Sequence, residues 1–275
     1  MRLTAEGLPD LVFNEPGSGL GCRVLDLGWP EARPVVFARP GRSGTRNHTR
    51  LHGARSVAVT AYTHDGDLGT RAEIVDRLTQ FCRPGLECYL WFDPESKRGP
   101  ETRRVLLHAD ALTAPHLGPV LREVTITWPA PTGLIEAADP STASITPPPP
   151  AEGFPFDLEL DLSFPGDAPV RTTAVTVAGT ADTWPTFTVD GPCVAPTILH
   201  DTTVLAFPDL TLGEGQSLVV DTDAQTVTVD GADRWHLLEG TPAPLTPGSN
   251  RIGFDADSHN PPARLTVGWR NQYLT

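Results

Sequence analysis

The chain has 275 residues, and 21 basic against 34 acidic residues give it a formal net charge of −13. The length suits two domains of ordinary size, and a hydrophobic content of 39% is enough for packed cores, which excludes disorder throughout. The strong negative charge makes the protein a poor general binder of nucleic acid, because it repels phosphate groups.

Other classes of protein are also disfavoured. No run of about 18 apolar residues is present, so we expect no membrane-spanning segment, and the start MRLTAEGLPDLVF has no secretory signal. Four cysteines are too few for a disulfide scaffold. We therefore expect a soluble protein that folds in a reducing cytoplasm.

The first half of the chain predicts strands around one helix. Thr70 and Glu73 form a capping box, and the apolar residues between Ile74 and Cys82 follow at helical spacing. Arg83-Pro84-Gly85 ends this helix. Alternating apolar and polar residues predict strands at residues 57–61, 86–92, 105–111 and 124–128.

A proline-rich segment, Asp139–Gly153, divides the chain. Its four consecutive prolines, Pro147–Pro150, favour an extended spacer. Residues 1–140 hold 16 basic and 17 acidic residues, net −1, whereas residues 141–275 hold 5 and 17, net −12. We therefore predict an N-terminal domain at 1–138, a linker at 139–153 and a C-terminal domain at 154–275.

The second half predicts only strands, which are short and rich in Val and Thr. They are expected at residues 157–163, 170–178, 186–189, 204–207, 217–221, 226–230, 250–255 and 264–273. About eight strands with turn signals every ~8–12 residues indicate a sandwich or jelly roll. The predicted fold class is therefore mainly β: a β-rich N-terminal domain with one α-helix, followed by a C-terminal β-sandwich.

No catalytic or nucleotide-binding motif stands out. The G-x-S-x-G elbow, H-E-x-x-H and the Walker loop are absent, and the glycine cluster Gly17–Gly21 is typical of a turn. We therefore predict no enzymatic activity, no catalytic residue and no cofactor.

Metal binding is also not expected. His48 and His52 are four apart, but a site needs further ligands and the neighbouring arginines repel a cation. The acidic stretch Asp221–Asp233 fails the calcium-loop pattern and is better explained by hairpin turns. Cys82 lies on the apolar stripe of the helix and Cys88 on an inward strand face, so both are expected to be buried.

The unusual charge feature is an arginine run, residues 33–55, with no acid between Glu31 and Asp65. Three interpretations are open: a solvated loop, a contact with an acidic neighbouring subunit, or a contact with passing DNA. Because the rest of the chain is acidic, a contact with protein is favoured over one with DNA. The candidate inter-subunit contacts are Arg39, Arg42, Arg46, Arg50 and Arg55. Trp235, beside a predicted turn, is a candidate glycan contact, whereas Trp269 belongs to a core face.

Both halves resemble the distal tail protein family of long-tailed bacteriophages, whose members are also called minor tail proteins. The first half shares the order of an arginine-bearing lead into a strand, a helix, a Pro-Gly turn, a strand ending in Asp93-Pro94 and a strand closing with Trp128–Pro131. The second half shares three stretches: Gly179–Gly191 followed by Pro196–Ile198, Gly215–Gly231, and Leu245–Ile252.

The resemblance implies a ring-forming N-terminal domain and a galectin-like C-terminal sandwich. Six copies would form a ring that joins the tail tube protein to the tip hub or tail-associated protein, in a virion assembled in the host cytoplasm. No membrane or specific nucleic-acid partner is implied, and the arginine bias suggests an actinobacterial host. The alternative is a carbohydrate-binding β-sandwich that acts in adsorption to the host surface.

Overall fold

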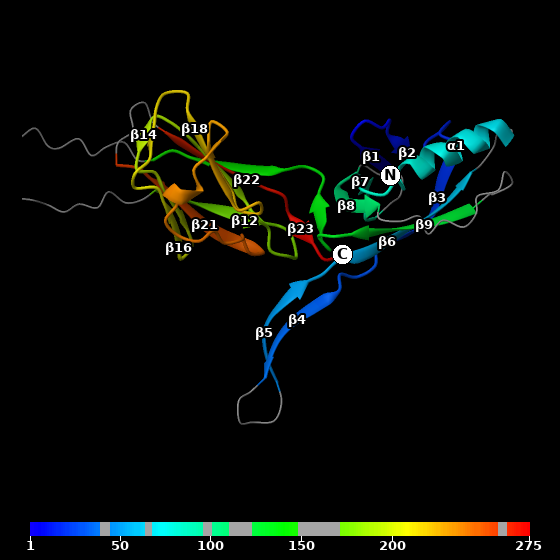
Figure 1. The fold of residues 1–275 in the computed structure, drawn as a ribbon, viewed down its shortest axis with the longest axis horizontal. Helices are drawn as coiled ribbons and strands as arrows, with labels where there is room; N and C mark the ends of the chain where they lie inside the picture. The colour runs from blue at the N-terminus through cyan, green and yellow to red at the C-terminus, as the bar shows by residue number, and fades with distance from the viewer. Residues whose placement is uncertain (39–44, 64–67, 96–100, 110–122, 148–170, 258–262) are drawn as a thin grey trace, which may run out of the picture. The chain divides into compact units, whose positions relative to one another are not determined.

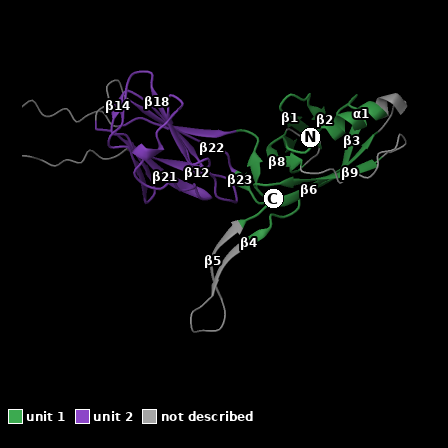
Figure 2. Cartoon of the chain, in the orientation of Figure 1, with its two compact units in different colours: residues 1–139, 272–275 green, residues 140–271 purple. Residues whose placement is uncertain are grey.

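The computed structural model describes residues 1–38, 45–63, 68–95, 101–109, 123–147, 171–257 and 263–275. The chain divides into two compact units. Unit 1 consists of Met1–Asp139 together with Gln272–Thr275, and unit 2 consists of Pro140–Asn271 (Figure 2). Unit 2 is therefore an insertion before the last strand of unit 1.

Unit 1 is built on two antiparallel sheets (Figure 1). The larger sheet has the strand order β2-β1-β7-β8-β10-β23 and the smaller one β3-β6-β9. In the larger sheet the strands are β1 (Arg2–Ala5), β2 (Leu11–Val12), β7 (Leu86–Phe92), β8 (Arg103–Ala109), β10 (Ile135–Ala137) and β23 (Gln272–Tyr273). In the smaller sheet they are β3 (Leu20–Asp26), β6 (Arg55–Thr63) and β9 (Glu123–Ala130).

One helix, α1 (Leu68–Gln80), packs on the core of unit 1. Ile74, Leu78 and Phe81 are buried with the inward residues of both sheets, as the helical spacing predicts. The indole Nε1 of Trp128 on β9 donates to the carbonyl of Phe81, 3.2 Å away, which ties the end of the helix to the smaller sheet. The predicted start was wrong, because the helix begins two residues before Thr70, which therefore lies in its first turn.

A hairpin of β4 (Ala32–Ala38) and β5 (Thr45–His52) forms a two-stranded sheet of its own. Figure 1 labels its two strands. The residues between its two strands lie outside the described part of the chain. The arginine run therefore belongs mainly to a β-hairpin rather than to a loop.

Unit 2 is a β-sandwich around a second core. Its sheets have the orders β11-β22-β13-β18-β19-β20 and β12-β21-β15-β16, and a small third sheet pairs β14 with β17. The strands are β11 (Ser141–Ile145), β12 (Arg171–Val177), β13 (Thr186–Asp190), β14 (Cys193–Val194), β15 (Thr197–His200), β16 (Thr203–Ala206), β17 (Thr211–Leu212), β18 (Ser217–Asp221), β19 (Thr226–Val229), β20 (Ala232–Asp233), β21 (Gly248–Asp255) and β22 (Arg264–Trp269).

The inward positions of these strands form the core of unit 2 as their alternation predicts. Phe187 and Val189 on β13 and Leu265 and Val267 on β22 are at most 1% exposed. Trp269 is also buried, which confirms its predicted place in the core. The mainly β fold class is confirmed, and the described residues contain one α-helix. Among these residues no helix is long and apolar enough to cross a bilayer.

The structure corrects two details of the predicted organisation. Residues 141–145 of the predicted linker form β11, which pairs antiparallel with β22 from Ser141↔Trp269 to Ile145↔Leu265. The strand expected at 264–273 is two strands, because β22 ends at Trp269, unit 2 ends at Asn271, and β23 pairs with β10 of unit 1. The strand expected at 157–163 lies outside the described residues.

Candidate functional site

The arginine run is only partly described. Arg46 and Arg50 are on β5, opposite Phe37 and Pro34 of β4, whereas Arg39 and Arg42 lie outside the described residues. The register of the two strands shifts between Pro34 and Val36, so positions 46 and 50 do not have the spacing that places residues of a regular strand on one face. In its described strands the hairpin has Arg33 on β4 and Arg46 and Arg50 on β5.

The root of this hairpin is closed by backbone hydrogen bonds. The Glu31 amide donates to the Ala54 carbonyl at 3.0 Å, and the Gly53 amide donates to the Glu31 carbonyl at 2.6 Å. Gly133, in the turn after β9, has a φ of +65°, and a Cβ there would overlap the Gly53 carbonyl oxygen. Three chain segments thus meet at van der Waals distance, which leaves the root no room for a side chain at residue 133.

Arg55 is buried beneath this root, with 2% of its surface exposed. Its guanidinium donates to three backbone carbonyls: Gly133 from Nε at 2.7 Å, Leu27 from Nη1 at 3.5 Å and Leu274 from Nη2 at 2.8 Å. Burial lowers the pKa of Arg55. Arg55 was predicted as an inter-subunit contact, and this was wrong: its charged end is used inside unit 1, where another copy cannot reach it.

Trp29, just before the hairpin, was not singled out by the sequence. Its side chain is 73% exposed, although tryptophan is normally largely buried. The preceding Gly28 has a φ of +56°, and a Cβ there would lie 2.5 Å from the Ser56 carbonyl oxygen. The Gly28 amide also donates to Asp26 Oδ1 at 2.9 Å. The Gly-Trp-Pro sequence at 28–30 was the available signal, since glycine permits this turn.

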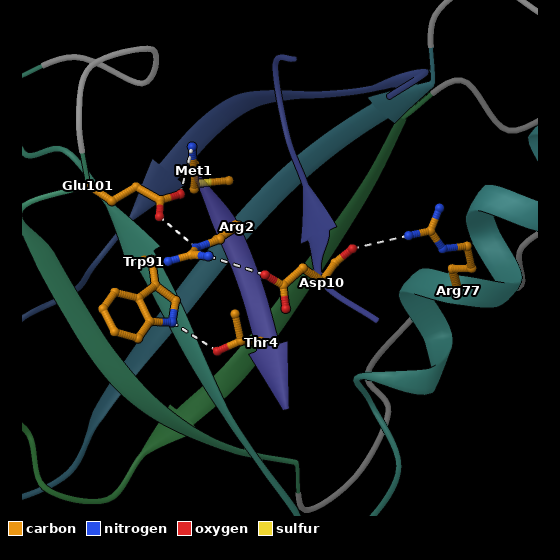
Figure 3. A network of polar contacts seen from close by, with 7 residues as sticks. All are labelled: Met1, Arg2, Thr4, Asp10, Arg77, Trp91 and Glu101. Carbon is orange, nitrogen blue, oxygen red and sulfur yellow. Dashed lines mark hydrogen bonds and ion pairs between the residues drawn. The ribbon is translucent and has the colours of Figure 1, made fainter. Parts of the chain in front are cut away.

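A polar network surrounds β1 in unit 1 (Figure 3). Glu101 contacts both the α-amino group of Met1, at 3.5 Å, and Arg2 Nε, at 2.7 Å. Asp10 accepts from Arg2 Nη1 through its carboxylate at 3.2 Å and from Arg77 of α1 through its backbone carbonyl at 3.1 Å. The network joins β1, the helix and Glu101, which precedes β8 by two residues. Both of its carboxylates contact Arg2, and that of Glu101 also contacts the Met1 amino group.

The outer face of the larger sheet carries two arginines stacked on aromatic rings. The guanidinium carbons of Arg2 and Arg104 lie 5.1 and 5.4 Å from the ring centre of Trp91. Arg104 also lies 4.4 Å from the Tyr89 ring, and its Nε and Nη2 contact Glu136 at 2.9 and 2.7 Å. This arrangement holds neighbouring strands together through cation–π contacts and a part-buried ion pair.

The glycan candidate Trp235 begins a short 3-10 helix (Trp235–Leu237) in unit 2 and is 40% exposed. Its amide donates to Asp233 Oδ1 at 3.0 Å, so the turn before it is fixed. Its ring is available to a ligand. No second aromatic ring contacts it among the described residues, and Trp184, 38% exposed, is the other exposed tryptophan of this unit.

The acidic stretch of unit 2 makes turns, as predicted. Asp221 Oδ1 accepts from the amides of Asp223 and Ala224, at 3.0 and 2.9 Å, and Asp230 Oδ1 accepts from the amide of Ser217 at 3.1 Å. Across the described residues, no three side chains of the metal-binding kinds gather in one place. His52 is exposed at the end of β5, and the side chain of His48 lies outside the described residues.

The predicted burial of Cys82 and Cys88 is confirmed, and Cys22 and Cys193 are buried as well. Burial raises the pKa of Cys82 and Cys193 to about 11. Burial, with a smaller effect from Cys82, raises that of Cys88 to about 12. These thiols remain protonated at neutral pH, which makes them poor nucleophiles and metal ligands.

Comparison with known proteins relates the chain to phage tails. The family described as "Siphovirus-type tail component, C-terminal domain" matches residues 178–273. No curated protein matches the chain.

Solved structures of phage proteins are similar to the chain, among them the following three. SPP1 Dit, whose title describes a paradigm of the hub adsorption apparatus in Gram-positive infecting phages, aligns over 98% of both chains with a TM-score of 0.61 and 13% identity. Two structures of the phage p2 baseplate in its activated conformation align over 97% of this chain and 96% of theirs. The one with Sr has a TM-score of 0.45 and 10% identity, and the one with Ca has 0.42 and 9%.

The family match covers most of unit 2, and the likeness to SPP1 Dit extends the shared fold over unit 1 as well. Residues 178–273 therefore match a siphovirus-type tail component domain, and the chain as a whole shares its fold with SPP1 Dit.

Proposed function

We propose that this protein is a structural, non-catalytic part of the virion tail tip, where its copies form a ring, expected to be hexameric, between the tail tube protein and the tip hub or tail-associated protein. The observation that carries the proposal is the siphovirus-type tail component domain at residues 178–273. The basic hairpin of unit 1 supports it, because a segment of one charge suits a contact with a different surface of the next copy. Such head-to-tail contacts close into rings when the rotation between copies permits.

The distribution of charge suggests which unit forms the ring. Unit 2 carries 5 basic and 17 acidic residues, a net −12, so its copies repel one another. Unit 1 is nearly neutral but has Arg33, Arg46 and Arg50 on the two strands of one hairpin. We therefore assign the ring contact to unit 1, with Arg42, Arg46 and Arg50 facing an acidic surface of the neighbour, and unit 2 to the outside.

Light scattering and electron microscopy of the full chain test this assignment. The full chain is required because Gln272–Thr275 belong to unit 1. We expect a closed ring that weakens when Arg42, Arg46 and Arg50 are replaced together by glutamate. Replacement of Arg234, Arg251 and Arg264 of unit 2 by glutamate is the matched control for charge. A chain that remains monomeric at every concentration, with and without tail tube protein, would exclude the ring.

Glycan binding by unit 2 is a second candidate function, favoured by the exposed ring of Trp235. Aromatic rings bind the apolar faces of sugars through stacking. A glycan array should then give a signal that Trp235→Ala removes while Trp184→Ala retains it. An array without signal for the wild-type protein would exclude this function for the sugars tested.

A further inference from the structure

We infer that Trp29 is the apolar anchor of the contact between neighbouring copies, with a second copy of this chain covering its indole ring. This inference rests on the proposed ring and adds to it the residue that supplies affinity. It concerns a side chain outside the arginine run, so that the two contributions can be separated by experiment.

The arginine run by itself does not account for a stable ring. Exposed ion pairs contribute about 0–1 kcal/mol each, and salt screens them. Charged side chains at the rim of an interface mainly speed association and select the partner. Affinity comes from a few residues that are buried fully on binding, and tryptophan is among the most frequent of these. The contact therefore needs an apolar residue close to the hairpin.

Trp29 fits this requirement by its exposure. In the described part of unit 1, the large apolar side chains that are exposed are Val24, at 48%, and Trp29, at 73%. The indole ring of Trp29 is the larger of the two, so covering it would remove the most apolar surface from water. A single exposed tryptophan does not by itself indicate an interface, so the inference also depends on the backbone and charges around Trp29.

The backbone around Trp29 is held in place on both sides. Before it, the Leu27 carbonyl accepts from Arg55 and the Gly28 amide donates to Asp26. After it, the Glu31 amide and carbonyl bond to Ala54 and Gly53 at the hairpin root. The ring is thus presented from a fixed main chain, and little backbone freedom is lost when a partner covers it. A residue in a freely solvated loop would not need these backbone hydrogen bonds on both sides.

Trp29 and the arginine run also belong to one continuous segment. Two residues separate Trp29 from β4, and the hairpin that follows carries Arg33, Arg46 and Arg50. A neighbouring copy that binds the basic hairpin would also reach Trp29, which lies at the root of the same hairpin. Such a contact has an apolar centre beside a charged rim, which is the usual anatomy of a specific interface.

Sedimentation and light scattering of the full chain test this inference, with Trp29→Ala as the variant. We expect the dissociation constant of the contact to rise by about thirtyfold or more, as for other anchor residues. Trp29→Phe should recover much of the affinity, because it keeps an aromatic ring. Trp235→Ala, which removes an exposed tryptophan from unit 2, should leave assembly unchanged. Circular dichroism should show all three variants folded.

The possible outcomes separate the inference from the proposed function. A wild-type ring that Trp29→Ala leaves equally stable overturns the role of Trp29 and keeps the ring. A wild-type chain that is monomeric throughout overturns both. A ring lost in Trp29→Ala but retained in Trp235→Ala supports the anchor. Strong weakening by salt of wild type and Trp29→Phe alike would support arginines at the rim of the same contact.

Discussion

Arg55 Nη2 donates a hydrogen bond to the carbonyl of Leu274, 2.8 Å away, which joins two residues 219 positions apart in the sequence. The last residues of the chain therefore complete unit 1 after the whole of unit 2 has intervened. A fragment that stops at residue 140 lacks this partner and lacks β23. Experiments on unit 1 should accordingly use the full chain.

Replacing Arg55 by methionine should destabilise unit 1 by about 3 kcal/mol or more. The change keeps much of the side-chain length but leaves buried carbonyls without a charged donor, and each such bond contributes about 1.5–3 kcal/mol. Arg23→Met is the matched control, because Arg23 pairs with Glu123 on the surface and both side chains are exposed. Calorimetry should show a clear loss for Arg55→Met and a change of at most about 1 kcal/mol for Arg23→Met. Equal effects would contradict the assigned role.

Tyr273→Ala should weaken the attachment of the C-terminal strand. The Arg103 guanidinium carbon lies 3.0 Å from the centre of the Tyr273 ring, which also packs against the core of unit 1. We expect a loss of about 2 kcal/mol or more from the cation–π contact and the packing. Tyr273→Phe keeps the ring and should stay within about 1 kcal/mol of wild type. Hydrogen exchange at β10 measures the effect, and protection unchanged by Tyr273→Ala would count against it.

Gly133→Ala should destabilise unit 1 more than Gly7→Ala does. Both glycines have positive φ, +65° and +75°, so both substitutions carry the backbone cost of about 1–2 kcal/mol. Only at Gly133 does the new Cβ also meet an obstacle, the Gly53 carbonyl, whereas nothing lies within 4 Å at Gly7. Urea denaturation of the two variants compares these costs directly. A smaller loss for Gly133→Ala than for Gly7→Ala would show that the hairpin root adjusts freely.

Unit 2 should lose stability in mild acid through His200, which is 4% exposed on β15. Burial lowers the pKa of His200, with the neighbouring Asp201 and Asn250 opposing the shift. The folded state therefore holds the neutral imidazole while the unfolded state takes up a proton below about pH 6.5. The stabilisation is complete above that pH and is lost as the pH falls toward the lower pKa of the folded state.

The measurement is the unfolding midpoint of unit 2 between pH 7.5 and 5. His200→Gln should lower the midpoint at neutral pH and flatten its dependence on pH. His236→Gln, at an exposed histidine of the same unit, should retain the wild-type slope. A slope that His200→Gln leaves unchanged would assign the acid sensitivity to another group.

The sequence by itself determined most elements and their buried faces. Alternation placed Cys88 and Leu90 of β7, and Leu265 and Val267 of β22, inside their cores, because a strand with one buried face repeats every two residues. The apolar stripe likewise identified α1. The phage-tail resemblance was also available from sequence, since strand and turn patterns recur along the chain.

Only the tertiary structure decided how distant segments combine. The polar strand β11 carries no apolar pattern except Ile145 at its end, and it becomes a strand because β22 supplies its hydrogen-bond partners. Arg55 looked like its neighbours in the arginine run, yet the chain buries it among carbonyls of Leu27, Gly133 and Leu274. The local sequence shows the periodicity and charge of a segment. Whether a given residue is buried depends on which distant segments of the chain pack beside it in the fold.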